Sequence, residues 1–293
     1  FERTHANKSF ESWEKYINYS EEEKVLMHEK ETKEEREREN KRLRKIKEDE
    51  ICSKNELFNH LKETYKFDGF HHYTDITNFF NIMKTGKLLS RNGAIELGFT
   101  DAADQSVLSH TYRYIKNYVR FYYKEKTPTL YKNEGIKTDN SPPHMPIPVL
   151  LIFDESIASH PETAFLSGGG GNPNSVITKD ISVAKKFDWN IIFYRGAIPR
   201  QENNLISVRN DTSGASITNK KNAEFLYPTE LDIKHIKRIV FRSPADLKTA
   251  EKVLGENYLF ELDKSRLKFN YQNNFLYNYD IRMHEYGFLI AFE

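Results

Sequence analysis

Hydrophobic and polar positions are distributed differently in the first 65 residues than in the rest of the chain. Residues 28–50 are almost all charged, so a helix over them has no continuous apolar stripe to bury. Capping boxes at residues 20–23 and 53–56 predict two helix starts, and the second helix has an apolar face. We therefore expect residues 1–65 to form a charged helical extension exposed to solvent. The alternatives are a docking surface for a partner protein or a basic face.

From residue 67 onward, short apolar runs alternate with segments of helical periodicity. Aromatic and β-branched runs predict strands at residues 70–73, 87–90, 118–123, 149–153, 191–194, 205–208, 235–242, 258–262, 266–269 and 287–292. Start and stop signals predict helices that begin after Asp75 or Thr74, after Asp180 and at Pro244, with Gly86 and Gly255 as ends. This mixture of strands and helices predicts an α+β fold.

Composition narrows the classes of protein that fit. The chain of 293 residues has 44 Lys plus Arg against 43 Asp plus Glu, a net charge of +1, so charge alone indicates neither a nucleic-acid nor a membrane partner. Cys52 is the single cysteine, which excludes an internal disulfide and a cysteine-built zinc site and fits a reducing compartment. With no visible secretory signal or membrane-length apolar run, we expect a cytoplasmic protein without a membrane partner.

Glu224 is the first candidate for a catalytic residue. It follows a long polar loop and opens the apolar run Phe225–Tyr227, which predicts a strand that begins at the carboxylate. At the start of a strand, a side chain can face a cleft. The alternative is a solvated residue that protects an edge strand from pairing.

Two further motifs bear on chemistry. His71 and His72 are adjacent in a predicted strand, so they point to opposite faces and cannot share a metal ion. We expect one to face the core or a cleft and the other solvent, with ordinary structural histidines as the alternative. The ten histidines form no close pair with ligand spacing, so we expect no metal site. Residues 167–173 are rich in glycine but lack the ending of a phosphate-binding loop, which favours a turn or a flexible linker.

Five blocks of sequence, in this order, resemble those of one known family. The blocks are residues 70–90 (FHHYTDITNFFNIMKTGKLLS), 117–131 (NYVRFYYKEKTPTLY), 148–154 (PVLLIFD), 187–195 (FDWNIIFYR) and 222–226 (NAEFL). They are similar to the DarT toxins, bacterial NAD-dependent ADP-ribosyltransferases that modify bases of single-stranded DNA; related phage-defence toxins modify RNA instead. The resemblance covers roughly residues 67–245. It implies a split antiparallel sheet that encloses an NAD cleft.

The resemblance also assigns roles to individual residues. Glu224 would be the catalytic glutamate, and Asn222, two positions before it, would help to choose the acceptor. The residues that would hold NAD are His72, Thr74, Asn81, Leu89 and Ser90. These assignments suit the chemistry, because cleavage of the nicotinamide–ribose bond develops positive charge that a carboxylate stabilises. The same carboxylate could take a proton from the attacking base nitrogen.

The arginine that the family places near the NAD phosphates has no unambiguous match. A guanidinium fork suits a diphosphate, and we choose Arg113 for this role, with Arg120 and Arg91 as alternatives. The long polar loop at residues 196–221 also departs from the family pattern. The family's target base therefore does not carry over directly.

Together these features predict a toxin-like ADP-ribosyltransferase domain at residues 66–293 that acts on a nucleobase of single-stranded DNA. The same chemistry on RNA or protein is one alternative, and an inactive scaffold that serves as an interaction module is another. We expect an antitoxin protein as partner. Lysines that could contact phosphates are Lys124, Lys126, Lys132, Lys220 and Lys221.

Overall fold

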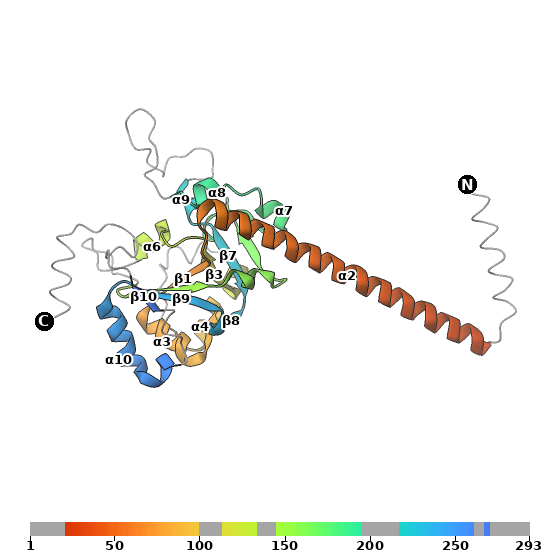
Figure 1. Ribbon diagram of the computed structural model, residues 1–293, viewed down its shortest axis with the longest axis horizontal. Helices are drawn as coiled ribbons and strands as arrows, with labels where there is room; N and C mark the ends of the chain where they lie inside the picture. Colours follow the sequence, from red (N-terminus) through yellow and green to blue (C-terminus); the bar gives the residue numbers. More distant parts are fainter. Residues whose placement is uncertain (1–20, 100–112, 134–144, 195–216, 261–266, 270–293) are drawn as a thin grey trace, which may run out of the picture. The chain divides into compact units, whose positions relative to one another are not determined.

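The computed structural model of the chain describes residues 21–99, 113–133, 145–194, 217–260 and 267–269 (Figure 1). Contacts within the chain divide it into two units, Phe1–Ser53 and Lys54–Glu293. This division falls earlier than the expected boundary at residue 65. The predicted strand at 205–208 and that at 287–292 lie outside the described residues.

Helix α2 (Glu21–Tyr65) contributes to both units. In the first unit, its described side chains are almost all exposed, as the charge pattern predicted. The expected second helix start at residue 53 is wrong, because α2 continues through this position. The sequence from 21 to 65 contains neither glycine nor proline, so nothing interrupts the helical backbone there.

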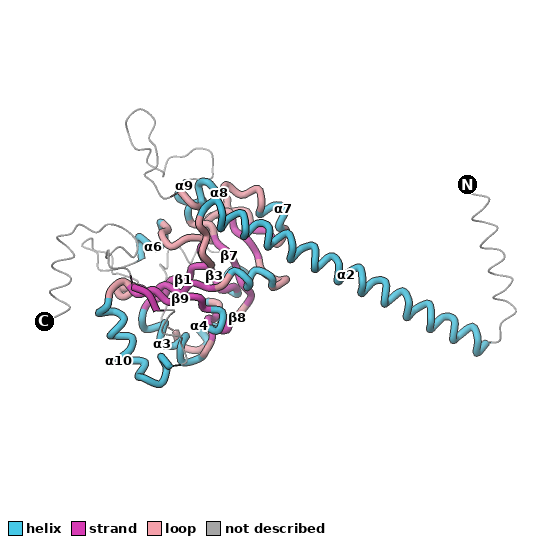
Figure 2. The backbone as a smooth tube through the Cα atoms, in the orientation of Figure 1, coloured by secondary structure: helices cyan, strands magenta, loops and turns pink. Residues whose placement is uncertain are grey.

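The second unit is built on an eight-stranded sheet in the order β10-β9-β4-β1-β3-β7-β5-β6. Figure 2 draws the strands in magenta. Its strands are β1 (Phe70–Asp75), β3 (Tyr118–Tyr122), β4 (Pro148–Phe153), β5 (Ala164–Leu166), β6 (Ile177–Thr178), β7 (Glu224–Pro228), β9 (Ile236–Phe241) and β10 (Leu267–Phe269). All neighbours are antiparallel except β9 and β10. A two-stranded sheet pairs β2 (Lys87–Leu89) with β8 (Glu230–Asp232).

The large sheet opens between its two central strands. β1 pairs with β4 over six residues and β3 pairs with β7 over five, whereas β1 and β3 share the single register pair His71 and Tyr122. This opening confirms the expected split antiparallel sheet and the α+β fold class.

Short helices connect the strands. They are α3 (Ile76–Thr85), α4 (Arg91–Glu96), η1 (Arg113–Asn117), α6 (Pro128–Asn133), η2 (Glu155–Ser159), α7 (Ile181–Ala184), α8 (Trp189–Ile192), α9 (Ile217–Lys221), η5 (Ile233–His235) and α10 (Pro244–Phe260). Asp75 and Asp180 cap α3 and α7 as predicted, and Gly86 ends α3 with a left-handed φ of 72°.

Two predicted strands are wrong. Residues 191–194 belong partly to α8, where Trp189 and Ile192 are buried at helical spacing; a short apolar run does not distinguish strand from helix. The segment at 258–262 begins within α10, whose backbone breaks at Gly255. The strands expected at 70–73, 87–90, 118–123, 149–153, 235–242 and 266–269 are confirmed within a residue or two.

Aromatic side chains fill one face of the sheet. Phe70 stacks on Phe225 with ring centroids 3.9 Å apart, and Phe121 contacts both rings. Leu57 and Phe58, near the end of α2, join the same cluster. Because side chains alternate along a strand, burial of Phe225 in this core turns its neighbours Glu224 and Leu226 to the opposite face.

None of the described helices is both long enough and apolar enough to cross a membrane.

Candidate active site

Glu224 is the first residue of β7, as the sequence predicted, and only 1% of its surface is exposed. The alternative of a solvated edge residue is wrong, because β7 lies between β3 and β5 inside the sheet. The Tyr123 hydroxyl donates a hydrogen bond of 3.2 Å to the backbone carbonyl of Glu224. A carboxylate so far from water needs compensating partners.

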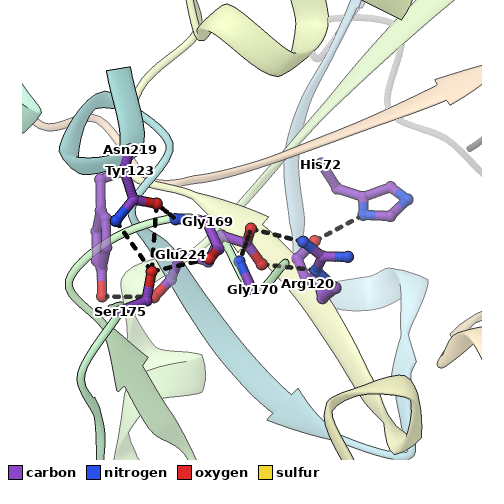
Figure 3. Close-up of polar contacts among 8 residues, drawn as sticks. All are labelled: His72, Arg120, Tyr123, Gly169, Gly170, Ser175, Asn219 and Glu224. Carbon is purple, nitrogen blue, oxygen red and sulfur yellow. Dashed lines mark hydrogen bonds and ion pairs between the residues drawn. The ribbon is translucent and has the colours of Figure 1, made fainter. Parts of the chain in front are cut away.

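Arg120 on β3 supplies the main compensation (Figure 3). Its Nε lies 2.6 Å from Glu224 Oε2 and its Nη2 lies 2.6 Å from Oε1, a bidentate pair. Although burial by itself lowers the pKa of Arg120, the charge of Glu224 and its hydrogen bonds raise that pKa above its ordinary value. The pair holds the carboxylate in one orientation.

A third donor to the carboxylate comes from the glycine-rich segment between β5 and β6. The backbone N–H of Gly170 donates to Glu224 Oε1 over 3.0 Å. A Cβ atom at Gly170 would lie 3.3 Å from Arg120 Nη2 and 3.5 Å from Glu224 Oε2, so glycine permits this close approach.

Asn219 on α9 fixes the same segment. Its Oδ1 accepts from the backbone N–H of Gly169 over 2.9 Å, and a Cβ at Gly168 would lie 2.4 Å from its Nδ2. The prediction of a turn is therefore correct, and that of a flexible linker is wrong. Sequence reasoning missed the contact of this turn with Glu224. The run of four glycines was the available signal, since such runs permit close backbone approach.

His72 lies at the opening between β1 and β3. Its Nδ1 is 2.9 Å from the backbone carbonyl oxygen of Arg120. Burial lowers the pKa of His72 to about 4; the hydrogen bond to the Arg120 carbonyl opposes this shift and the Arg120 charge adds to it. The imidazole is thus neutral at pH 7. Because a carbonyl can only accept, we assign the proton to Nδ1, which makes Nε2 a hydrogen-bond acceptor.

His71 takes a different position from its neighbour. It is 2% exposed, and its Nε2 lies 3.2 Å from a carboxylate oxygen of Asp68. His72 is half-buried. The expectation that one of the two histidines faces the core or a cleft is confirmed by His71, whereas His72 is half-buried rather than facing solvent.

The other residues assigned to NAD occupy consecutive elements that follow His72. Thr74 is buried in β1, and Asn81 is half-buried on α3. Leu89 ends β2, and Ser90 caps α4 by accepting from the Gly93 N–H over 3.4 Å. Their contacts with NAD stay predictions.

The structure separates the three candidate arginines. Arg120 contacts Glu224, Arg113 is exposed at the start of η1, and Arg91 is half-buried at the start of α4. The role of Arg113 at the NAD phosphates also stays a prediction. Asn222 directs its Oδ1 to the backbone N–H of Thr129, 3.0 Å away, so the amide oxygen stabilises the segment after β3.

The lysines predicted to contact phosphates differ in exposure. Lys126 is exposed, whereas Lys124 is buried, with Nζ 3.5 Å from the Tyr194 carbonyl oxygen. Lys220 pairs with Asp188 at 3.0 Å. The Lys221 ammonium lies 5.7 Å from the centre of the Tyr194 ring, and burial lowers the pKa of Lys221. The structure does not describe the side chain of Lys132.

The described residues fit a nucleotide sugar better than a metal ion. They contain no group of three or more His, Cys, Asp or Glu that could hold a metal. A buried carboxylate and a neutral imidazole with an acceptor nitrogen suit the hydroxyl groups of a ribose. These groups on the central strands of a split antiparallel sheet fit the site expected of an NAD-dependent ADP-ribosyltransferase.

Comparison with known proteins identifies the family within this class. The family model described as "ssDNA thymidine ADP-ribosyltransferase, DarT" matches residues 71–275, more than half of the chain. The chain belongs to the DarT family, and its donor of ADP-ribose is NAD. Both the family resemblance and the enzyme class expected from the sequence are confirmed.

One solved structure shares the fold, and two more are similar to the chain. Thermus sp. 2.9 DarT in complex with ADP-ribosylated ssDNA matches with a TM-score of 0.53 and 18% identity, over 71% of this chain and 95% of that one. The complex of the same Thermus protein with NAD+ matches with a TM-score of 0.49 and 19% identity, over 71% and 96%. Thermosipho africanus DarTG in complex with ADP-ribose matches at 0.47 and 15%, over 71% and 51%. The comparison with curated proteins found no match.

Proposed function

We propose that this chain transfers ADP-ribose from NAD to a thymine base of single-stranded DNA, with Glu224 as the catalytic carboxylate. Membership of the DarT family supports the reaction and the acceptor. The observation that carries the role of Glu224 is its burial beside β3, where Arg120 and the Gly170 N–H hold the carboxylate. A buried charge with preorganised partners is typical of a catalytic group.

When bound, NAD supplies the ADP-ribosyl group and nicotinamide as the leaving group. Glu224 accepts a hydrogen bond from a ribose hydroxyl and stabilises the positive charge that develops as the glycosidic bond breaks. The electron pair of that bond leaves with nicotinamide. A nitrogen of the acceptor base forms the new bond to the sugar and loses its proton to the Glu224 carboxylate.

The remaining assignments belong to the same proposal. His72 accepts from a ribose hydroxyl through Nε2, and Arg113 binds the diphosphate. Thr74, Asn81, Leu89 and Ser90 complete the NAD contacts. Asn222 contributes to acceptor choice through the amide nitrogen of its side chain, because its oxygen is bonded to Thr129.

Transfer of label from NAD to oligonucleotides tests the proposal. We expect labelled DNA from single-stranded oligonucleotides that contain dT, and no label with Glu224→Gln. Glu162→Gln is the matched control, since Glu162 is exposed and pairs with Lys179 on the surface. Transfer that survives Glu224→Gln removes the catalytic role of Glu224. If the label appears on RNA or on protein instead, that class of molecule is the acceptor and the DNA assignment is wrong.

The second candidate function is an interaction module without transferase activity. The exposed, charged part of α2 in the first unit favours it, because such a surface can bind a partner protein. Calorimetry with NAD separates the two functions. We expect NAD binding, and its absence would favour the interaction module.

We further propose that the enzyme acts as a cytoplasmic toxin with an antitoxin protein as partner. An enzyme that attaches a bulky ADP-ribosyl group to DNA bases damages the cell that makes it unless an inhibitor holds it in check. Expression of the unaltered chain should arrest growth, and Glu224→Gln should relieve the arrest. Equal growth arrest by both forms would contradict this proposal.

A further inference from the structure

We propose that Arg120 competes with NAD for the Glu224 carboxylate, so that the arginine side chain must leave before the ribose binds. The bidentate pair of Arg120 and Glu224 then acts as an intramolecular block on the site. This inference deepens the proposed function and rests on it, because it takes Glu224 as the acceptor of a hydrogen bond from the ribose.

The carboxylate of Glu224 already uses most of its capacity to accept hydrogen bonds. An ionised carboxylate has about four acceptor sites on its two oxygens. Arg120 Nε takes one on Oε2, while Arg120 Nη2 and the Gly170 N–H take two on Oε1. Only 1% of the Glu224 surface is exposed, so a solute does not reach what remains. A ribose hydroxyl therefore bonds to Glu224 only after one of these donors moves away.

The glycine-rich turn, which carries the Gly170 donor, is held in place by its neighbours. Asn219 Oδ1 accepts from the Gly169 N–H over 2.9 Å, and the Ser175 hydroxyl donates to the Gly169 carbonyl over 2.9 Å. Both bonds lie next to Gly170, so a withdrawal of its N–H would strain or break them as well. The turn is therefore the less suitable of the two groups to move.

The side chain of Arg120 is the group that is free to leave. It is 27% exposed, so it borders solvent, in contrast to the carboxylate that it covers. Among the described residues, the guanidinium pairs with no carboxylate other than Glu224. Rotation about the side-chain bonds thus breaks a single ion pair and returns the charged group to water, while the backbone of β3 keeps its place in the sheet.

The pair also opposes the proposed reaction through its charge. Glu224 stabilises the positive charge that develops on the sugar, and this effect needs a carboxylate whose own charge is not neutralised. The guanidinium lies 2.6 Å from both carboxylate oxygens and places positive charge at the same point. Departure of Arg120 therefore frees the acceptor sites and the negative charge of Glu224 together.

Calorimetry with NAD measures the block directly. If the paired form is populated about ten times more than the open form, the apparent dissociation constant is about ten times that of an open site. We therefore expect Arg120→Met, which has no donor for Glu224, to bind NAD about tenfold more tightly than the unaltered chain. Arg120→Lys keeps the charge without the guanidinium fork and should show an intermediate affinity. Because it keeps a cation beside Glu224, it also serves if Arg120→Met does not fold.

Two comparisons separate the block from a general loosening of the sheet. Arg238→Met is the matched control, since it breaks the pair of Arg238 on β9 with Asp68, and it should leave the affinity for NAD unchanged. Glu224→Gln supplies the second comparison, because it removes the charge that holds Arg120. In that background, Arg120→Met should change the affinity for NAD by less than about twofold.

Three results would overturn the inference. Unchanged or weaker NAD binding in the folded Arg120 variants would leave Arg120 with a positioning role alone. An equal gain in the Glu224→Gln background would mean that Arg120 only fills space. If neither the unaltered chain nor any variant binds NAD, the proposed function fails and the block fails with it, whereas NAD binding by the unaltered chain without a gain in the variants removes the block alone.

Discussion

Arg120 holds both carboxylate oxygens of Glu224 at 2.6 Å, although the two residues lie 104 positions apart in the sequence. The pair joins β3 to β7 on the face of the sheet opposite its aromatic core. Because Arg120 also offers its carbonyl to His72, one residue connects the carboxylate to the imidazole. A change in the position of Arg120 should therefore affect both the Glu224 carboxylate and the His72 imidazole.

Removal of Arg120 should destabilise the fold strongly. Arg120→Ala leaves a buried charge at Glu224 without its main partner, and breaking a buried pair in this way costs about 3–5 kcal/mol. Urea unfolding measures the loss. Arg38→Ala, which breaks an exposed pair with Glu34, should cost less than about 1 kcal/mol. The double variant Arg120→Met with Glu224→Gln should regain most of the stability; failure to do so would mean that packing of Arg120 dominates over its charge.

The neutral state of His72 predicts a dependence of stability on pH. Because the pKa of His72 is lowered to about 4 in the folded state, from 6.5, the unfolded chain binds the proton first as the pH falls. The contribution of His72 to the free energy of unfolding is constant above pH 6.5. Between pH 6.5 and 4 the protein loses roughly 3 kcal/mol of stability through this residue. His72→Gln should lack this part of the curve. A histidine exposed on α2 supplies the control, and His28→Gln should follow the unaltered chain.

Gly168 should tolerate no side chain while Asn219 keeps its position. In Gly168→Ala the new Cβ would lie 2.4 Å from Asn219 Nδ2, and we expect overpacking to cost about 1–3 kcal/mol in thermal unfolding. The double variant Gly168→Ala with Asn219→Ala should cost less than the sum of the single changes. Gly93→Ala is the control, since its Cβ would make an ordinary contact of 3.5 Å inside α4. Equal losses at both glycines would contradict the tight approach.

Asn222 should have a structural effect that can be separated from acceptor choice. Asn222→Ala leaves the part-buried backbone N–H of Thr129 without the oxygen that accepts from it at 3.0 Å. This loss should lower stability by about 1–2 kcal/mol. Asn222→Asp keeps the accepting oxygen and should retain stability but change the preference among oligonucleotides, because the amide nitrogen is lost. Unchanged base preference in Asn222→Asp would remove Asn222 from acceptor recognition.

Local sequence signals determined much of the fold. The start of β7 at Glu224, the caps of α3 and α7 by Asp75 and Asp180, and the end of α3 at Gly86 all follow from interactions within a few residues. These features depend on backbone chemistry that the neighbouring residues settle by themselves. The five sequence blocks likewise sufficed for the family.

Only the tertiary structure decided which groups meet at the site. The contact of Arg120 with Glu224 depends on the register of β3 against β7, and the contact of Gly170 with Glu224 spans 54 positions. The lowered pKa of His72 depends on burial between strands that the sequence separates. Helix α8 forms where a strand was predicted, because a short apolar run can be buried equally well as a strand or as a helix. The sequence by itself determined most of the elements and the place of the carboxylate at the start of β7. Long-range packing decided the partners of that carboxylate, because those contacts form between segments that carry no local signal of one another.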